Sequence, residues 1–160
     1  MANNYTLTST FYPLDPKHHA RAEEIIEEVG KQAEAEDYGY EVGSEDYEAV
    51  EGWVDFEYET QDDGIWFYFS ESANPDQIAD VIAKFQVEFN ADMPFTFSYC
   101  FECSKPRIDE FGGGSLAVMP DGEIFHAGST QDALDKAARS HRYAQIAWTA
   151  DDILTLRPEW

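Results

Sequence analysis

The pattern of hydrophobic and polar positions at the start of the chain predicts a strand followed by a long helix. Residues 5–12 alternate and are rich in Thr and aromatic side chains, which is typical of a half-buried strand. Asp15 and Pro16 then supply an N-cap and a proline at the first helical position. The hydrophobic residues that follow recur at helical spacing and predict a helix over about 16–36: Ala22, Ile25, Ile26, Val29 and Ala33.

Two strands joined by a tight turn come next, after an acidic connection. The connection covers residues 37–52, and we expect a short helix within it at about Ser44–Val50. Residues 54–59 alternate without a break, which predicts a strand with one acidic face, and residues 65–69 return as its partner. The turn between them, 61–64, contains Asp-Gly, which is a hairpin signal.

A second helix and a further strand follow. Asn74 and Pro75 repeat the combination of an N-cap and a proline, and Gln77 is placed for a capping box. A stripe at helical spacing predicts the buried side of this helix: Ile78, Val81, Ile82, Phe85 and Phe89. Residues 95–103 alternate as a strand whose one face carries aromatic side chains: Phe95, Phe97, Tyr99 and Phe101.

The order of these elements predicts the fold class. Up to residue 103 it is β-α-β-β-α-β, which is typical of a ferredoxin-like antiparallel sheet with its helices on one face. Residues 104–160 are expected to add a hairpin and a helical extension. We therefore predict one acidic α+β domain over residues 1–160, a length that suits a single domain.

The extension is predicted to begin with strands at 114–119 and 123–126. A third helix is expected over 129–142, a last strand over 145–148 and a short helix from residue 149. Four residues form the inward side of the third helix: Ala133, Leu134, Ala137 and Ala138.

The uncovered face of the predicted sheet is expected to be acidic. Helices on one face leave the other face free, and RNA-binding sheets of this kind use that face with aromatic and basic side chains. Here the alternation places Asp55, Glu57 and Glu59 opposite the aromatic core side. This expectation excludes recognition of nucleic acid by the open face.

The net charge narrows the classes of partner. The chain has 10 Lys plus Arg against 33 Asp plus Glu, a formal charge of −23. Affinity for DNA or RNA comes from neutralisation of phosphates by Lys and Arg, so direct binding of nucleic acid is excluded. Anionic membranes are disfavoured for the same reason. Basic surfaces, cations and neutral ligands remain as partners.

The charge is concentrated in under a third of the chain. Residues 1–22 carry a net charge of +1, residues 23–71 carry −17 and residues 72–160 carry −7. Such asymmetry indicates a charged partner. A salt-adapted acidic protein is the alternative, but its charge should be uniform and bulky aromatics scarce, whereas this chain has 24 aromatic residues.

We expect a soluble, cytoplasmic protein. No apolar run approaches the roughly 18 residues that a membrane span needs. The first residues carry neither a basic stretch nor an apolar segment that would indicate a signal peptide. Two cysteines do not make the disulfide framework of a secreted protein.

The outer face of the first helix brings like charges together. Glu23 and Glu27, and likewise Glu24 and Glu28, lie one helical turn apart, and each pair costs about 0.2–0.5 kcal/mol in an isolated helix. Only Glu27 has a base one turn away, Lys31.

Signatures of catalysis and metal binding are weak. Cys100 and Cys103 form a C-x-x-C, but positions three apart on a strand point to opposite faces, and a zinc site needs two more ligands. His18 and His19 fit a solvated first helical turn, and no phosphate-binding, metalloprotease, nucleophile-elbow or EF-hand pattern occurs. We predict no catalytic residue, metal or cofactor.

The segment from Lys105 to Gly114 is the most unusual part of the sequence. Its triple glycine can let backbone amides approach an anion beside Lys105 and Arg107. The favoured interpretation is a loop that turns sharply into the second hairpin, with both bases paired to neighbouring acids. A small enzyme or ligand-binding protein with a site around residues 100–114 is therefore kept as an alternative function.

Three stretches carry a resemblance: residues 1–6 (MANNYT), Asn74-Pro75-Asp76, and the run 103–114 with its pattern C-S-K-P-R-x-x-E-F-G-G-G. Together they resemble a family of small, uncharacterised acidic proteins carried on plasmids, phages and integrative elements. The resemblance covers roughly residues 1–130. It implies a mobile-element setting and supplies no catalytic residues.

These observations favour an interaction protein that acts as a DNA mimic, without an enzymatic activity of its own. Carboxylates on one strand face repeat at about 6.7 Å, and such a row competes for the Lys and Arg that DNA would neutralise. The expected partner is a basic nucleic-acid-binding protein, by analogy a host defence nuclease or a CRISPR complex. The predicted partner-binding residues are Glu23, Glu24, Glu27, Glu28, Glu34, Asp37, Glu45, Asp46, Glu48, Asp55, Glu57 and Glu59.

Aromatic residues among these carboxylates are expected to anchor the interface. They are Tyr38, Tyr40, Tyr47, Trp53 and Tyr58. The oligomeric state is left open.

Overall fold

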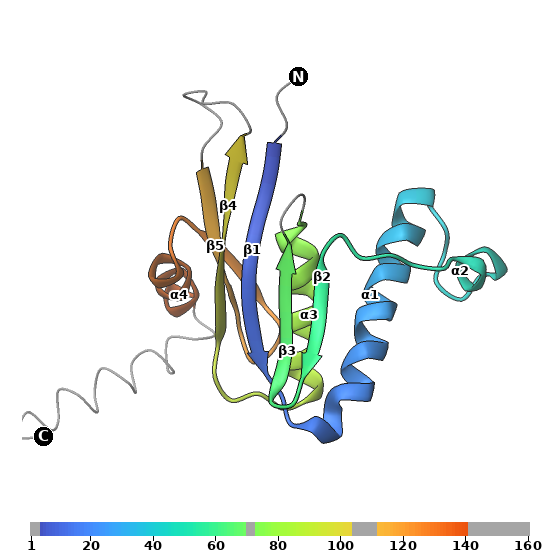
Figure 1. Cartoon of the computed structure of the whole chain (residues 1–160), viewed down its shortest axis with the longest axis horizontal. Coiled ribbons are helices and arrows are strands. Elements are labelled where there is room, and N and C mark those ends of the chain that lie inside the picture. Colours follow the sequence, from blue (N-terminus) through green and yellow to red (C-terminus); the bar gives the residue numbers. More distant parts are fainter. Residues whose placement is uncertain (1–3, 70–72, 104–111, 141–160) are drawn as a thin grey trace, which may run out of the picture.

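The structure is a computed structural model that describes residues 4–69, 73–103 and 112–140. Within these ranges it contains a six-stranded antiparallel sheet and four α-helices (Figure 1). The predicted strand at 145–148, the helix from residue 149 and the end of the third helix lie outside the described residues.

The sheet has the strand order β2-β3-β1-β4-β5-β6. Its strands are β1 (Asn4–Pro13), β2 (Glu57–Gln61), β3 (Gly64–Phe69), β4 (Phe95–Cys103), β5 (Gly112–Val118) and β6 (Ile124–Ala127). The first strand of the chain is central and pairs with β3 on one side and with β4 on the other. The strands predicted within the described residues are thus confirmed, although β2 begins three residues later than the alternation from Val54 indicates.

The helices lie close to the predicted positions, and both predicted N-caps, Asp15 and Asn74, are confirmed. The helices are α1 (His19–Tyr38), α2 (Glu45–Ala49), α3 (Pro75–Glu88) and α4 (Thr130–Arg139), and a 3₁₀ turn, η1 (Pro16–His18), precedes α1. Asp15 caps this turn by accepting the Lys17 N–H at 3.0 Å. Ser44, Asn74 and Ser129 cap the later helices with their side-chain oxygens.

The main core lies between the sheet and the pair α1 and α3. Ile25 and Ile26 from α1, Phe85 from α3 and Ile65 and Phe67 from β3 are fully buried there. The predicted hydrophobic stripes of both helices therefore face the sheet. A continuous core of this kind gives the surface elements a rigid support.

One polar pair lies inside this core. The Tyr12 hydroxyl donates to Gln86 Oε1 at 2.9 Å, and Gln86 Nε2 donates to the carbonyls of Met93 and Val118 at 2.8 and 3.0 Å. Burial raises the pKa of Tyr12 to about 12. These hydrogen bonds satisfy every polar group of the pair and join β1, α3 and β5.

The helix α4 covers the opposite face of the sheet. Leu116 and Val118 of β5 belong to the main core, whereas the alternate residues Ala117 and Met119 form a second cluster with Ala133 of α4. Because successive strand residues point to opposite faces, α4 lies across the sheet from α1 and α3. It covers the β5–β6 end of the sheet (Figure 1).

The uncovered face of the sheet was predicted to be acidic, but next to the β2 edge it carries aromatic side chains. Glu57 and Glu59 are exposed at the β2 edge, but their partners on the next strand are Tyr68 and Trp66. These two rings stack at 4.3 Å, and the Trp66 indole donates to Ser9 Oγ at 2.8 Å. Ile65 and Phe67 occupy the core side of β3, so Trp66 and Tyr68, which alternate with them, must face the other way.

The predicted capping box at α3 is also wrong. Gln77 Oε1 accepts the backbone N–H of Asp55 at 2.6 Å, while Asn74 N–H donates to the Asp55 carbonyl at 2.8 Å. The start of α3 therefore binds the chain just before β2. These bonds take both backbone polar groups of Asp55, so this residue lies outside the strand ladder.

Candidate interaction surface

Four exposed glutamates lie in the second and third turns of α1: Glu23, Glu24, Glu27 and Glu28. Glu23 is turned towards the sheet edge, since the Thr60 hydroxyl of β2 donates to its Oε1 at 2.7 Å. Burial raises the pKa of the neighbouring Tyr58, and the negative charges of Glu23 and Glu27 raise it further. The glutamates of α1 and the β2 edge therefore act on each other electrostatically.

Arg21 neutralises two of the four α1 glutamates, Glu24 and Glu28. Its guanidinium forms ion pairs with Glu24, Glu28 and Glu88, and thereby joins α1 to the end of α3. The hydrogen bond from Arg21 lowers the pKa of Glu88, and its three carboxylate partners raise the pKa of Arg21.

The predicted compensation of Glu27 by Lys31 is wrong. No ion pair joins these two residues in the described part of the chain, and the base that compensates α1 is Arg21. Lys31 instead lies against Gly52, where an added Cβ would stand 2.7 Å from Lys31 Cγ. The pair of Arg21 with Glu24 spans only three residues and was available from the sequence, whereas the link from Arg21 to Glu88 spans 67 residues.

The edge strand β2 adds carboxylates at the same end of the sheet, on the face turned away from the core. Glu57 and Glu59 are exposed on its outer face, and Asp62 and Asp63 are exposed in the turn that follows. Asp55 is half-buried and held by α3, so it is not part of this row.

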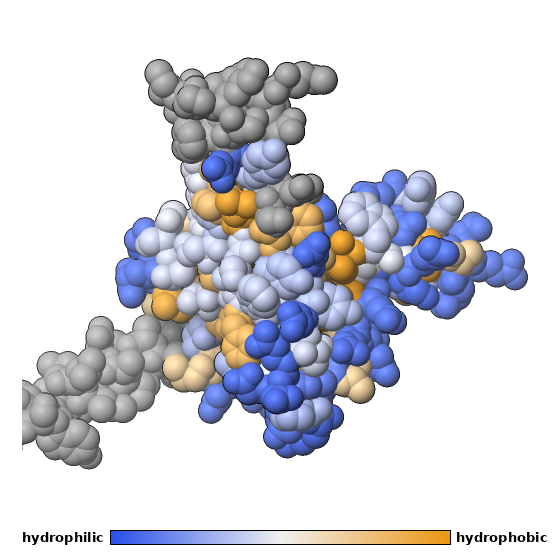
Figure 2. Space-filling view, in the orientation of Figure 1, coloured by the Kyte–Doolittle hydropathy of each residue, from blue (hydrophilic) through white to orange (hydrophobic). Residues whose placement is uncertain are grey.

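The helix α2 carries a second acidic group away from the sheet. Its exposed carboxylates are Glu45, Asp46 and Glu48, and Asp37 is exposed at the end of α1. Figure 1 shows α2 projecting beyond α1 on the β2 side of the molecule. Figure 2 shows a largely hydrophilic surface over α1 and around α2.

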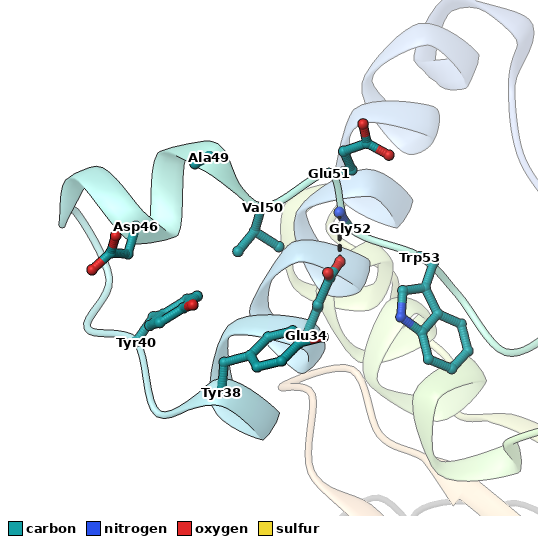
Figure 3. A pocket seen from close by; sticks show the side chains of 9 residues that line it. All are labelled: Glu34, Tyr38, Tyr40, Asp46, Ala49, Val50, Glu51, Gly52 and Trp53. Carbon is teal, nitrogen blue, oxygen red and sulfur yellow. Dashed lines mark hydrogen bonds between the residues drawn. The ribbon is translucent and has the colours of Figure 1, made fainter.

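A pocket opens between the end of α1, α2 and the chain that follows it (Figure 3). Its volume is about 370 Å³. Nine residues line it: Glu34, Tyr38, Tyr40, Asp46, Ala49, Val50, Glu51, Gly52 and Trp53. We call it the Tyr38–Trp53 pocket.

Of the residues predicted as aromatic anchors, three are exposed. Tyr38 is 65% exposed, Tyr40 is 39% exposed and Trp53 is 61% exposed, and all three line the Tyr38–Trp53 pocket. Tyr47 and Tyr58 are half-buried, and Tyr58 packs against the main core. The two groups differ because Tyr58 alternates inward on β2, whereas Tyr38 and Tyr40 lie where α1 ends.

The structure thus gathers most of the predicted partner-binding residues on one side. Those on α1, α2 and β2 occupy neighbouring elements at the β2 end of the sheet, while β5, β6 and α4 lie at the other end (Figure 1). Within the described residues, ion pairs engage only Glu24 and Glu28 of the twelve. Glu34 lies in the pocket and Asp55 lies apart.

A smaller acidic group was missed by the sequence analysis. Burial raises the pKa of Asp80 on α3, and the charges of Asp76 and Glu36 raise it further against the opposing effect of Lys84. The one-turn spacing of Asp76 and Asp80 was the available signal. The approach of Glu36 from α1 needs the packed structure.

The segment around residues 100–114 stays largely outside the described residues. Cys100 is exposed on β4, and residues 104–111 and the Cys103 side chain are not described. Among the described residues, no three His, Cys, Asp or Glu side chains are arranged to hold a metal ion. None of the described helices has the length and apolar character to cross a bilayer.

Comparisons with protein-family models, curated proteins and solved structures give no match to this chain.

Proposed function

We propose that this protein is a DNA mimic, whose acidic surface occupies the basic nucleic-acid-binding surface of another protein. The observation that carries the proposal is the exposed, mostly unpaired set of carboxylates on α1, α2 and β2. We call this set the acidic surface; its residues are Glu23, Glu24, Glu27, Glu28, Asp37, Glu45, Asp46, Glu48, Glu57 and Glu59. Residues 23–63 hold 17 acidic residues against one base, Lys31.

The charge density supports competition with nucleic acid. Seven carboxylates fall between Glu23 and Asp37 of α1. At a rise of about 1.5 Å per residue this is about one charge per 3 Å, close to the roughly 3.4 Å per phosphate of one DNA strand. Because Arg21 pairs with Glu24 and Glu28, five of the seven carboxylates keep no ion pair in the described structure, which is about one charge per 4 Å of helix.

The proposed setting is a mobile genetic element, and it rests on the resemblance of residues 1–130. The proposed target within that setting is a host defence protein that binds nucleic acid, such as a nuclease or a CRISPR complex. The charge supports a basic target without choosing among these proteins.

We also propose that β1 to β4 with α1 and α3 form a ferredoxin-like unit, extended by β5, β6 and α4. The element order β-α-β-β-α-β and the adjacency β2-β3-β1-β4 support this assignment. In this unit α1 lies beside the β2 edge, so Glu23 reaches Thr60 on the core side of the strand, while Glu57 and Glu59 extend the acidic surface onto the opposite side of the same edge.

The test compares two variants of equal charge change. One replaces Glu27, Glu57 and Glu59 by Lys on the acidic surface. The matched control replaces Asp92, Glu102 and Asp135 by Lys; these three residues are exposed but lie outside the acidic surface. Immobilised full-length protein is incubated with host lysate, and bound proteins are released with duplex DNA or with salt.

We expect the native chain and the control to capture a nucleic-acid-binding protein that duplex DNA releases. The α1 and β2 variant should lose most of this capture, because each reversed charge repels a basic surface. Capture should weaken steeply as the salt concentration rises, since surface electrostatics are screened within about 10 Å at 0.1 M salt. Equal capture by both variants, or no release by DNA, would contradict the proposal.

A further inference from the structure

The Tyr38–Trp53 pocket presents aromatic faces to solvent beside carboxylates. Large aromatic side chains are usually buried, yet its three rings are between 39% and 65% exposed. Tyr38 and Tyr40 stack with their centroids 5.6 Å apart and their planes inclined by 23°. Figure 3 shows Glu34 reaching into the space between Tyr40 and Trp53.

The Glu34 carboxylate is held in place and still has acceptor capacity. Its Oε2 accepts the Gly52 N–H at 2.9 Å, which joins α1 to the chain after α2. No donor in the described part of the chain reaches its Oε1. A half-buried carboxylate that is fixed by one backbone bond loses little further freedom when it binds a ligand.

The local charge selects a cation. Three carboxylates line the pocket: Glu34, Asp46 and Glu51. Lys31 has its aliphatic stem against Gly52 and does not line the pocket. Aromatic faces attract cations through the ring quadrupole, so the rings and the carboxylates favour the same type of group.

We propose that the Tyr38–Trp53 pocket binds one arginine side chain of a protein partner. The planar guanidinium stacks on a tyrosine face and donates to Glu34 Oε1, a combination that a lysine ammonium supplies less well. The inference rests on the proposed function, because that function requires a basic partner. It adds an aromatic anchor, which a row of phosphate-like charges lacks.

The test uses the full chain and a capped pentapeptide, Gly-Gly-Arg-Gly-Gly. Peptides with citrulline or lysine in place of arginine serve as neutral and ammonium controls. Chemical shifts of the Trp53 indole N–H and the Gly52 amide are followed by NMR during titration. Four variants are compared with the native chain: Tyr40→Leu and Glu34→Gln in the pocket, and Phe101→Leu and Glu102→Gln as matched exposed controls.

We expect saturable shifts at Trp53 and Gly52 with the arginine peptide, weaker ones with lysine and none with citrulline. Tyr40→Leu and Glu34→Gln should each weaken binding about threefold to tenfold, in line with a cation–π contact or one charged hydrogen bond. Glu34→Gln keeps the oxygen that accepts the Gly52 N–H, so the pocket should stay folded. The two control variants should bind as the native chain does.

Shifts spread evenly over the acidic surface, with unchanged affinity in Tyr40→Leu and Glu34→Gln, would overturn the proposal. The outcome is separate from that of the DNA-mimic test. If charge reversal on α1 and β2 abolishes capture and the pocket variants bind peptide and partner normally, only the pocket inference fails. If the arginine peptide binds in the pocket but captured proteins resist release by DNA, only the proposed function fails.

Discussion

At the scale of single residues, one buried polar pair joins the elements of the core. Tyr12 and Gln86 form a closed set of hydrogen bonds between β1, α3 and β5. A polar pair in an apolar core stabilises the fold only while every group keeps its partner. Its protonation state therefore connects the stability of the whole sheet to pH.

Stability should fall at alkaline pH through Tyr12. Burial raises its pKa to about 12 in the folded state, against about 10 for an exposed tyrosine. Because the folded state holds the proton more tightly, the contribution is full below pH 10 and is lost as the pH rises towards 12. The expected loss is about 3 kcal/mol of unfolding free energy.

Urea unfolding of the native chain and of Tyr12→Phe between pH 9 and 12 checks this value. At pH 9 the variant should be about 1 kcal/mol less stable, because Gln86 Oε1 loses its donor. Towards pH 12 the difference should vanish or reverse, since the variant has no ionisable group at this position. Parallel loss of stability in both proteins would show that Tyr12 does not titrate in this way.

At the scale of elements, the position of α2 depends on close backbone approach. Gly52 has a φ of +76°, and a Cβ there would lie 2.7 Å from both Lys31 N and Lys31 Cγ. Gly30 on α1 lies under the Trp53 backbone, with a Cβ 3.1 Å from its carbonyl oxygen. The chain after α2 therefore lies directly on α1, which shapes the Tyr38–Trp53 pocket.

Gly52→Ala should destabilise the protein more than Gly43→Ala does. Both positions have positive φ, which costs a non-glycine residue about 1–2 kcal/mol. Only Gly52 adds a clash with backbone, since nothing lies within 4 Å of a Cβ at Gly43. We expect a loss of about 2–4 kcal/mol for Gly52→Ala and about 1–2 kcal/mol for Gly43→Ala in urea unfolding. Equal losses would mean that the approach of α2 to α1 is not tight.

Short-range signals in the sequence predicted most of these elements. The caps Asp15, Ser44, Asn74 and Ser129 act within three residues, so each could be identified without the fold. Hydrophobic periodicity located the buried sides of α1 and α3 for the same reason.

Contacts between residues far apart in the chain could not be predicted from the sequence. Gln77 fits a capping box locally, but its amide binds Asp55 across 22 residues. Arg21 reaches Glu88, and Glu34 reaches Gly52, only after the helices pack. The aromatic residues between β3 core positions were available from alternation, yet the acidic pattern of β2 alone was extended to the whole face.

At the scale of the whole molecule, the acidic segment of the sequence gathers at one end of the sheet. The sheet order places β2 at an edge, and α1 and α2 lie beside it, so residues far apart in the chain contribute to the same field. Arg21 is the cation that the described structure places in this row. Such a field raises association rates at low salt.

The central claim is that this side of the molecule competes with DNA. The most direct measurement is the apparent dissociation constant of duplex DNA for the captured partner, taken at increasing concentrations of the native chain. The constant should rise in proportion to the chain's concentration, and the Glu27, Glu57 and Glu59 to Lys variant should leave it almost unchanged. A constant that stays level, or a complex containing partner, DNA and chain together, would contradict the account.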